Sequence, residues 1–258
     1  MSKIIIFLVL SINTLFAIDA TMEIIKKSHT LPNINVSVSS DSDDTGLIKK
    51  IKKIVIQDLT VSGHFNVSNL NKSIPYNSNP DINLMKQNNI DLFLNLQIQK
   101  KTSDGVILYI SLFDINSNKS VFNKSFSTSK RSRYPFLAHR SSISINEYLN
   151  APSIGWMDKF VIFSRSTGAK KSEIVIADYT LTFQKVIVKG GLNVFPKWAD
   201  KAQESYYYTT YNKTVPTLMR ANLYTGKKEQ ILKSDGMIVA SDVSSDGKKI
   251  LLTMSPNG

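Results

Sequence analysis

The feature that most constrains this chain is a repeat with a period of 45 residues in its C-terminal part. Short apolar runs are centred on Val161, Tyr206 and Leu251, each 45 positions after the one before, and each follows a polar turn that contains an aspartate. A period near this length, with several short strands per unit, is typical of β-propeller blades, which bury their faces against neighbouring blades. Two blades and the first strand of a third are therefore expected, at about residues 154–192, 199–237 and from 244 onward.

The part of the chain before the repeat has a different pattern. Apolar residues at spacings of three and four predict a helix that begins after the capping residues 42–44 and ends at Gly63. Strands are predicted at 33–38, 91–99, 106–114 and 121–127, and further helices at 80–88 and 135–149. Helices segregated from a mainly antiparallel sheet define an α+β domain. The predicted fold is an α+β N-terminal domain over residues 18–150, followed by an incomplete all-β propeller domain over residues 151–258.

The N-terminus predicts export. Lys3 precedes an apolar run that ends at Ala17, the pattern of a signal peptide over residues 1–17; an uncleaved membrane anchor is the alternative. No later segment approaches the roughly 20 apolar residues of a spanning helix, so no direct membrane span is expected. The chain has no cysteine. This excludes disulfides, a thiol nucleophile and a lipoprotein anchor.

The net charge of +12 raises the question of whether the protein binds nucleic acid. The basic residues are spread along the chain and do not interleave with aromatic residues as a stacking platform would require. No nucleic-acid partner is therefore expected. A solvated basic surface is the favoured interpretation, and such a surface attracts acidic partners or anionic lipid headgroups.

The residues that carry catalytic chemistry do not form a recognisable set. The three histidines are not at metal-ligand spacing, and no Gly-rich phosphate loop or nucleophile elbow is present. The S-x-x-K match at Ser127 and Lys130 lacks its companion motifs. We expect His139 to pack or hydrogen-bond in the interior, and the turn aspartates to bond their own backbone rather than calcium. Successive tyrosines at 206–208 should face opposite sides of a strand. The sequence thus predicts no enzyme, no cofactor and no metal.

Several segments resemble a known family in the order expected for it. These are IKKIVIQDLTVSGHFNV (51–67), the hairpin at 91–114, YPFLAHRSSISINEYL with its Ala-His followed by Ser, and the blade segments FPKWADKAQESYYYTTY and VSSDGKKILLTMSPNG. Together they resemble the TolB family of Tol-Pal system proteins. Residues 198–201 (WADK) depart from the family's W-S-P-D-G turn. The family closes six blades, so at about 45 residues per blade roughly 160 to 180 residues are expected beyond this chain.

The resemblance implies a periplasmic, non-enzymatic adaptor that is monomeric at full length. It would couple a TolA-like inner-membrane protein to a Pal-like peptidoglycan-associated lipoprotein and support envelope integrity and cell division. The segment implied for the TolA-like partner is Ile18, Asp19, Ala20, Thr21, Met22 and Glu23. The residues implied for the Pal-like partner, in connections between blades, are Gly191, Leu192, Asn193, Val194, Met237, Ile238, Val239 and Ala240. Ordinary blade linkers are the alternative for this second group.

Two other functions stay open at the level of sequence. The propeller could belong to an exported peptidase or hydrolase whose catalytic domain lies beyond Gly258, and a G-x-S-x-G motif there would decide for it. A propeller that binds a small ligand would need convergent polar groups in its central channel, and too few blades are present to judge this.

Overall fold

The computed structural model describes residues 30–68, 70 and 72–255. The predicted signal peptide and the segment Ile18 to Glu23 lie outside these residues. The chain divides into two compact units, and the division falls between Met157 and Asp158.

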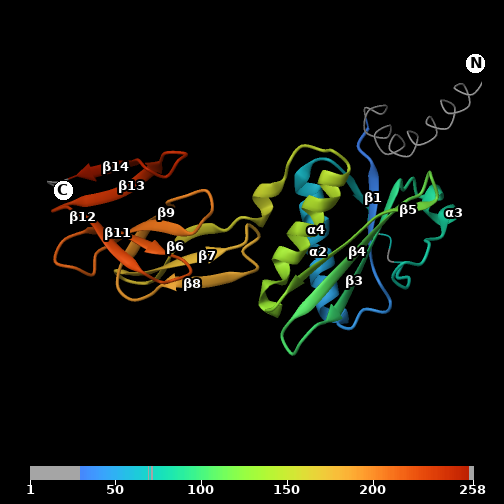
Figure 1. Ribbon diagram of the computed structural model, residues 1–258, viewed down its shortest axis with the longest axis horizontal. Helices are drawn as coiled ribbons and strands as arrows, with labels where there is room; N and C mark the ends of the chain where they lie inside the picture. The colour runs from blue at the N-terminus through green and yellow to red at the C-terminus, as the bar shows by residue number, and fades with distance from the viewer. Residues whose placement is uncertain (1–29, 69, 71, 256–258) are drawn as a thin grey trace, which may run out of the picture. The chain divides into compact units, whose positions relative to one another are not determined.

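The first unit contains a five-stranded sheet in the order β2-β1-β3-β4-β5 (Figure 1). Its strands are β1 (Asn33–Val38), β2 (Asn66–Ser68), β3 (Leu92–Lys100), β4 (Val106–Asp114) and β5 (Lys119–Thr128). β1 pairs in parallel with both β2 and β3, whereas β3, β4 and β5 pair antiparallel. The sheet is therefore mixed, and the expectation of a mainly antiparallel sheet was wrong for its β2-β1-β3 half. The cause is connectivity. Helix α2 (Thr45–Ser62) connects β1 to β2 and carries the chain back to the end of the sheet where β1 began, so the two strands run in the same direction.

The described helices of this unit are α2 (Thr45–Ser62), α3 (Ile82–Gln87) and α4 (Tyr134–Tyr148), with a short 3₁₀ helix, η2 (Arg131–Arg133), before α4. Another 3₁₀ helix, η3 (Gly155–Asp158), spans the division between the units. The predicted ends of α2 are confirmed. The Asp44 carboxylate accepts a hydrogen bond from the Leu47 backbone N–H at 2.9 Å, which caps the helix start. Gly63 ends the helix in the left-handed region, at φ +70°.

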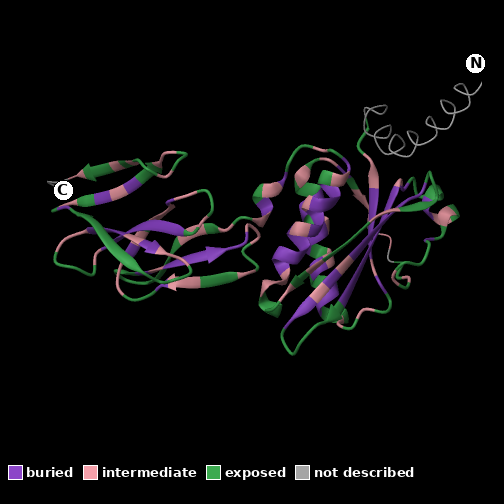
Figure 2. Cartoon of the chain, viewed as in Figure 1, coloured by how far each residue is buried: buried purple, intermediate pink, exposed green. Residues whose placement is uncertain are grey.

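The main core lies between one face of the sheet and two helices. Helices α2 and α4 lie side by side on this face (Figure 1). All seven α2 positions that the helical spacing places on its inner face are buried: Leu47, Ile48, Ile51, Ile54, Val55, Asp58 and Leu59. A smaller apolar cluster, around Met85, Phe93 and Phe113, packs α3 against the sheet. Figure 2 shows the inner faces of α2, α4 and the central strands as buried.

Among the described residues, the second unit consists of three antiparallel sheets. The first sheet is β6-β7-β8, the second is β12-β11-β10-β9, and the third is β13-β14. Their strands are β6 (Val161–Gly168), β7 (Lys171–Ala177), β8 (Gln184–Val188), β9 (Asn193–Trp198), β10 (Ser205–Thr210), β11 (Thr217–Asn222), β12 (Lys228–Lys233), β13 (Met237–Val243) and β14 (Ile250–Ser255).

Two sequence expectations need correction here. Asn193 and Val194, and the segment from Met237 to Ala240, were expected in connections, but they are the first residues of β9 and β13. The third sheet accordingly has two strands rather than one, because β14 pairs with β13 upstream of it. The sequence hid these strands because each begins directly after a Gly-containing turn and β9 carries a proline, which is atypical inside strands.

The tyrosines of β10 confirm that successive side chains take opposite faces. Tyr206 and Tyr208 pack with Ile174 and Val188 of the first sheet, whereas Tyr207 packs with Ile238 of the third sheet. Strand β10 of the second sheet is thus buried on both faces by the neighbouring sheets, whereas β12 of the same sheet is exposed. Burial, followed by the neighbouring Tyr208, raises the pKa of Tyr206 to about 12.

Candidate functional site

The first candidate segment is a tight turn that enters β9. Gly190 and Gly191 have φ values of +81° and +66°, which only glycine adopts readily. Asn212, which follows β10, holds this turn. Its Oδ1 accepts a hydrogen bond from the Leu192 N–H at 2.8 Å, and its Nδ2 donates to the Gly190 carbonyl at 2.9 Å. A Cβ on Gly191 would lie 1.6 Å from Asn212 Oδ1, so a side chain at this position would displace the Asn212 amide from its hydrogen bonds to the turn.

The same turn is fixed to the first sheet through Asn193. The Asn193 backbone N–H donates to Ser172 Oγ at 3.0 Å, and its side-chain Nδ2 donates to the Gly190 carbonyl at 2.7 Å. Ser172 lies in β7 and Asn212 follows β10, so side chains from two sheets hold one turn. Asn193 itself is buried. We therefore assign Asn193 a structural role, whereas Gly191, Leu192 and Val194 are half-buried.

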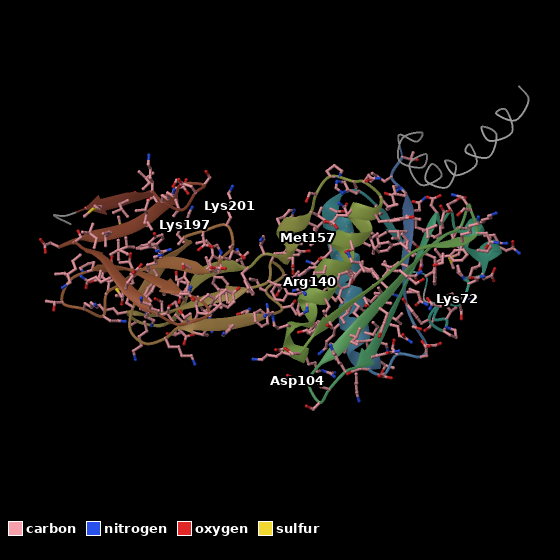
Figure 3. All side chains as sticks on the ribbon, viewed as in Figure 1. Lys72, Asp104, Arg140, Met157, Lys197 and Lys201 are labelled. Atoms are coloured by element: carbon pink, nitrogen blue, oxygen red, sulfur yellow. The ribbon has the colours of Figure 1, made fainter. Side chains whose placement is uncertain are left out.

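The second candidate segment, at the start of β13, alternates between inside and outside. Ile238 and Ala240 are buried against the second sheet, whereas Met237 is 39% exposed and Val239 is half-buried. The Ile238 carbonyl accepts a hydrogen bond from Thr209 Oγ1 of β10. Lys197 of β9, labelled in Figure 3, forms an ion pair with Asp242 of β13 at 3.0 Å. Met237 and Val239 are thus the two residues among 237–240 that are not buried.

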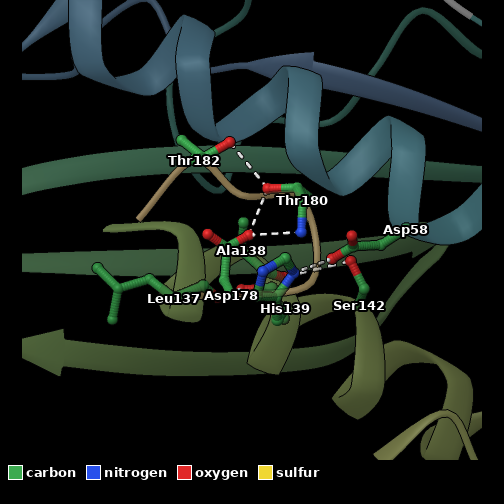
Figure 4. Close-up of polar contacts among 9 residues, drawn as sticks. Asp58, Leu137, Ala138, His139, Ser142, Asp178, Thr180 and Thr182 are labelled. Atoms are coloured by element: carbon green, nitrogen blue, oxygen red, sulfur yellow. Dashed lines mark hydrogen bonds and ion pairs between the residues drawn. The ribbon is translucent and has the colours of Figure 1, made fainter. Parts of the chain in front are cut away.

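The residues with catalytic potential are used structurally. His139 and Asp58 form a buried hydrogen bond between α4 and α2 (Figure 4), as expected for an interior histidine. Asp200 accepts hydrogen bonds from the backbone N–H groups of Glu204 and Ser205, which confirms a turn role for this aspartate. Hydrogen bonds from Ser244 and from the Lys248 N–H hold the pKa of Asp246 below its usual value. Among the described residues no group of three or more acidic or histidine side chains is placed to hold a metal ion.

Sequence reasoning missed Ser172 and Asn212, the two side chains that fix the first turn. Ser172 is 21 residues from Asn193, and Asn212 is 20 residues from Leu192, the residues whose backbone N–H groups they bind. A polar residue beside a turn gives no local signal of such a contact, so only the packing of the sheets reveals it.

In the part of the chain that the structure covers, no helix is both long and apolar enough to cross a membrane.

These features define a class of protein, an α+β domain followed by antiparallel sheets that each pack on the next. Residues 20–121 match the family of TolB amino-terminal domains. The chain is 47% identical over 257 residues to Tol-Pal system protein TolB of Wolinella succinogenes, covering 99% of this chain and 60% of that protein. It is 44% identical over 255 residues to the protein of the same name from Helicobacter hepaticus, covering 97% and 58%.

The fold agrees with this relationship. The crystal structure of TolB from Acinetobacter baumannii superposes with a TM-score of 0.68 at 25% identity, over 89% of this chain and 56% of that one. The chain is thus related to Tol-Pal system protein TolB along nearly its whole length. It spans about 60% of the length of these curated relatives.

Proposed function

We propose that this chain is the larger part of a non-enzymatic adaptor of the Tol-Pal system that works in the periplasm. The observation that carries the proposal is the 47% identity to a Tol-Pal system protein across 99% of the chain, which includes both units. The adaptor would couple a TolA-like inner-membrane protein to a Pal-like outer-membrane lipoprotein. This role requires two separate binding surfaces and no chemical step.

We further propose that the three sheets of the second unit are consecutive propeller blades. The 45-residue repeat supports this, as does the burial of Tyr206 and Tyr207 against different neighbouring sheets. In this arrangement β9 and β13 are the first strands of their blades. The segments that enter β9 and β13 then take equivalent positions in successive blades.

The Pal-like partner would bind at these equivalent positions, through Gly191, Leu192, Val194, Met237 and Val239. The hydrogen bonds of Asn212 and Asn193 support this, because a turn that is already fixed loses little conformational entropy on binding. The TolA-like partner would bind the segment from Ile18 to Glu23 as an added strand.

Titration calorimetry of the full-length protein with each purified partner tests the proposal. Leu192→Glu and Met237→Glu should each weaken binding of the Pal-like lipoprotein at least about tenfold, as expected for apolar anchors. Tyr224→Glu is the matched control, because Tyr224 is 71% exposed and lies outside both segments.

Deleting Ile18 to Glu23 should abolish binding of the TolA-like protein and preserve binding of the Pal-like lipoprotein. Equal loss of both partners would count against two separate surfaces.

A further inference from the structure

Three segments that are distant in the sequence bring exposed lysines to one end of the first unit. Hydrogen bonds join the segments: the Asp43 N–H donates to the Ile98 carbonyl at 3.0 Å, and the Lys100 N–H donates to the Asp43 carboxylate at 2.8 Å. Arg131 pairs with Asp44, and its N–H donates to Asp104 at 3.3 Å. Figure 1 shows the starts of α2 and α4 and the β3–β4 turn at this end. We call the following lysines the basic end: Lys49, Lys50, Lys53, Lys100, Lys101 and Lys130.

The lysines of the basic end outnumber the carboxylates beside them, which are Asp43, Asp44 and Asp104. All six are exposed, and within the described residues none forms an ion pair with a carboxylate. Helix α2 has one acidic residue, Asp58, and this residue is buried on the opposite face. The nearby carboxylates of Asp43, Asp44 and Asp104 accept hydrogen bonds from backbone N–H groups and keep their negative charge, so they offset part but not all of the charge of the six lysines. The start of α4 adds the positive partial charge of a helix N-terminus, whereas the start of α2 is capped by the Asp44 carboxylate.

The basic end lacks what a protein partner usually requires. The large apolar side chains that the described structure leaves exposed include none from residues 43–53, 98–106 or 128–133. Protein interfaces depend on buried aromatic or apolar anchors, which are therefore missing here. Long, flexible lysines without anchors suit a surface of diffuse negative charge. Each lysine near an anionic lipid surface strengthens binding about fivefold at physiological salt.

We propose that the basic end is a docking surface for a membrane that carries anionic lipid headgroups. The inference does not rest on the proposed Tol-Pal role, because it uses residues outside both partner-binding segments. Contact would be peripheral and electrostatic, with the lysine ammonium groups at the headgroups and no side chain inserted into the hydrocarbon. Binding should therefore fall steeply as salt is raised.

Co-sedimentation with vesicles of phosphatidylglycerol and phosphatidylcholine tests the proposal. The chain is used from Ile18 onward, so that the apolar residues 1–17 do not themselves insert. We expect binding to the mixed vesicles and not to pure phosphatidylcholine. The triple variant Lys49→Gln, Lys50→Gln, Lys53→Gln should bind about 100-fold more weakly. The matched control is Lys227→Gln, Lys228→Gln, Lys233→Gln, which removes the same charge from exposed positions of the second unit. It should retain binding within about threefold.

Three results would overturn the proposal. The first is an equal loss in both triple variants, which would mean that only net charge matters. The second is binding to phosphatidylcholine that salt does not reduce. The third is binding to soluble polyglutamate but not to anionic vesicles, which would assign the basic end to an acidic protein partner. Far-ultraviolet circular dichroism of both variants should match the parent, because all six substituted side chains are exposed.

Discussion

The side chains of His139 and Asp58 meet inside the first unit, with Nδ1 of the histidine 2.9 Å from Oδ2 of the aspartate and neither side chain exposed. His139 comes from α4 and Asp58 from α2, so this contact joins the two helices that cover the sheet. A second polar contact joins His64 Nδ1, just after the end of α2, to Asn146 Oδ1, near the end of α4, at 2.6 Å. The apolar core gives the helices their affinity for the sheet, and these two contacts specify how they align with each other.

Removing one member of the buried pair should be costly. Asp58→Ala leaves a buried imidazole without this acceptor, and we expect a loss of about 3 kcal/mol in the free energy of unfolding of the first unit. Urea unfolding measures this. In a double-mutant cycle, Asp58→Ala with His139→Ala should lose at least about 1 kcal/mol less than the sum of the single variants. Additive losses would show that the two side chains do not act as a pair.

The turn at Gly191 should tolerate no side chain. Gly191→Ala places a Cβ on Asn212 and forces alanine to φ +66°, so we expect a loss well above the about 1–2 kcal/mol that the backbone conformation alone costs. Gly226→Ala is the matched control. Gly226 has φ +70°, but no atom lies within 4 Å of the position that its Cβ would take, so only the backbone cost remains. Thermal unfolding of the second unit compares the two variants, and similar losses would refute a role for Asn212 in requiring glycine.

Alkaline pH should destabilise the second unit through Tyr206. Its pKa in the folded state, about 12, lies above the usual 10.0, so its contribution to stability is complete below pH 10.0 and is lost as pH rises toward 12. Tyr206→Phe removes this titration and should flatten the loss of stability over that range. Fluorescence of Trp198 in a Trp156→Phe background follows this unit alone. An unchanged alkaline slope in Tyr206→Phe would contradict the prediction.

Acid pH should weaken the start of α2 through Asp44. The Leu47 N–H, followed by Arg131, holds the pKa of Asp44 below the usual 3.8. The contribution of Asp44 is therefore present above pH 3.8 and is lost as pH falls through its lower folded-state value. Asp44→Ala should cost about 1 kcal/mol near neutral pH, whereas Asp44→Asn should keep the cap and lose the acid dependence. Urea unfolding of both variants across this pH range distinguishes the cap from the charge.

Local pattern was enough to predict several elements of the fold. The spacing of apolar residues gave the buried face of α2, including Asp58, and turn chemistry gave its ends at Asp44 and Gly63. Alternation gave β3 and β4, and the 45-residue repeat gave the order of the sheets in the second unit. These features depend on neighbours within a few residues or on a regular spacing along the chain, so the sequence by itself determined them.

Only the tertiary structure decided the features that depend on long-range pairing. The parallel pairing of β1, the early starts of β9 and β13, and the contact of Asn212 with the Gly191 turn arise between segments far apart in the chain. The lysines of the basic end lie in three such segments, which meet through the Asp43 and Asp44 contacts. Hydrogen bonding and charge act through space rather than along the sequence. For this reason the sequence predicted which residues are polar, and the fold decided which of them meet.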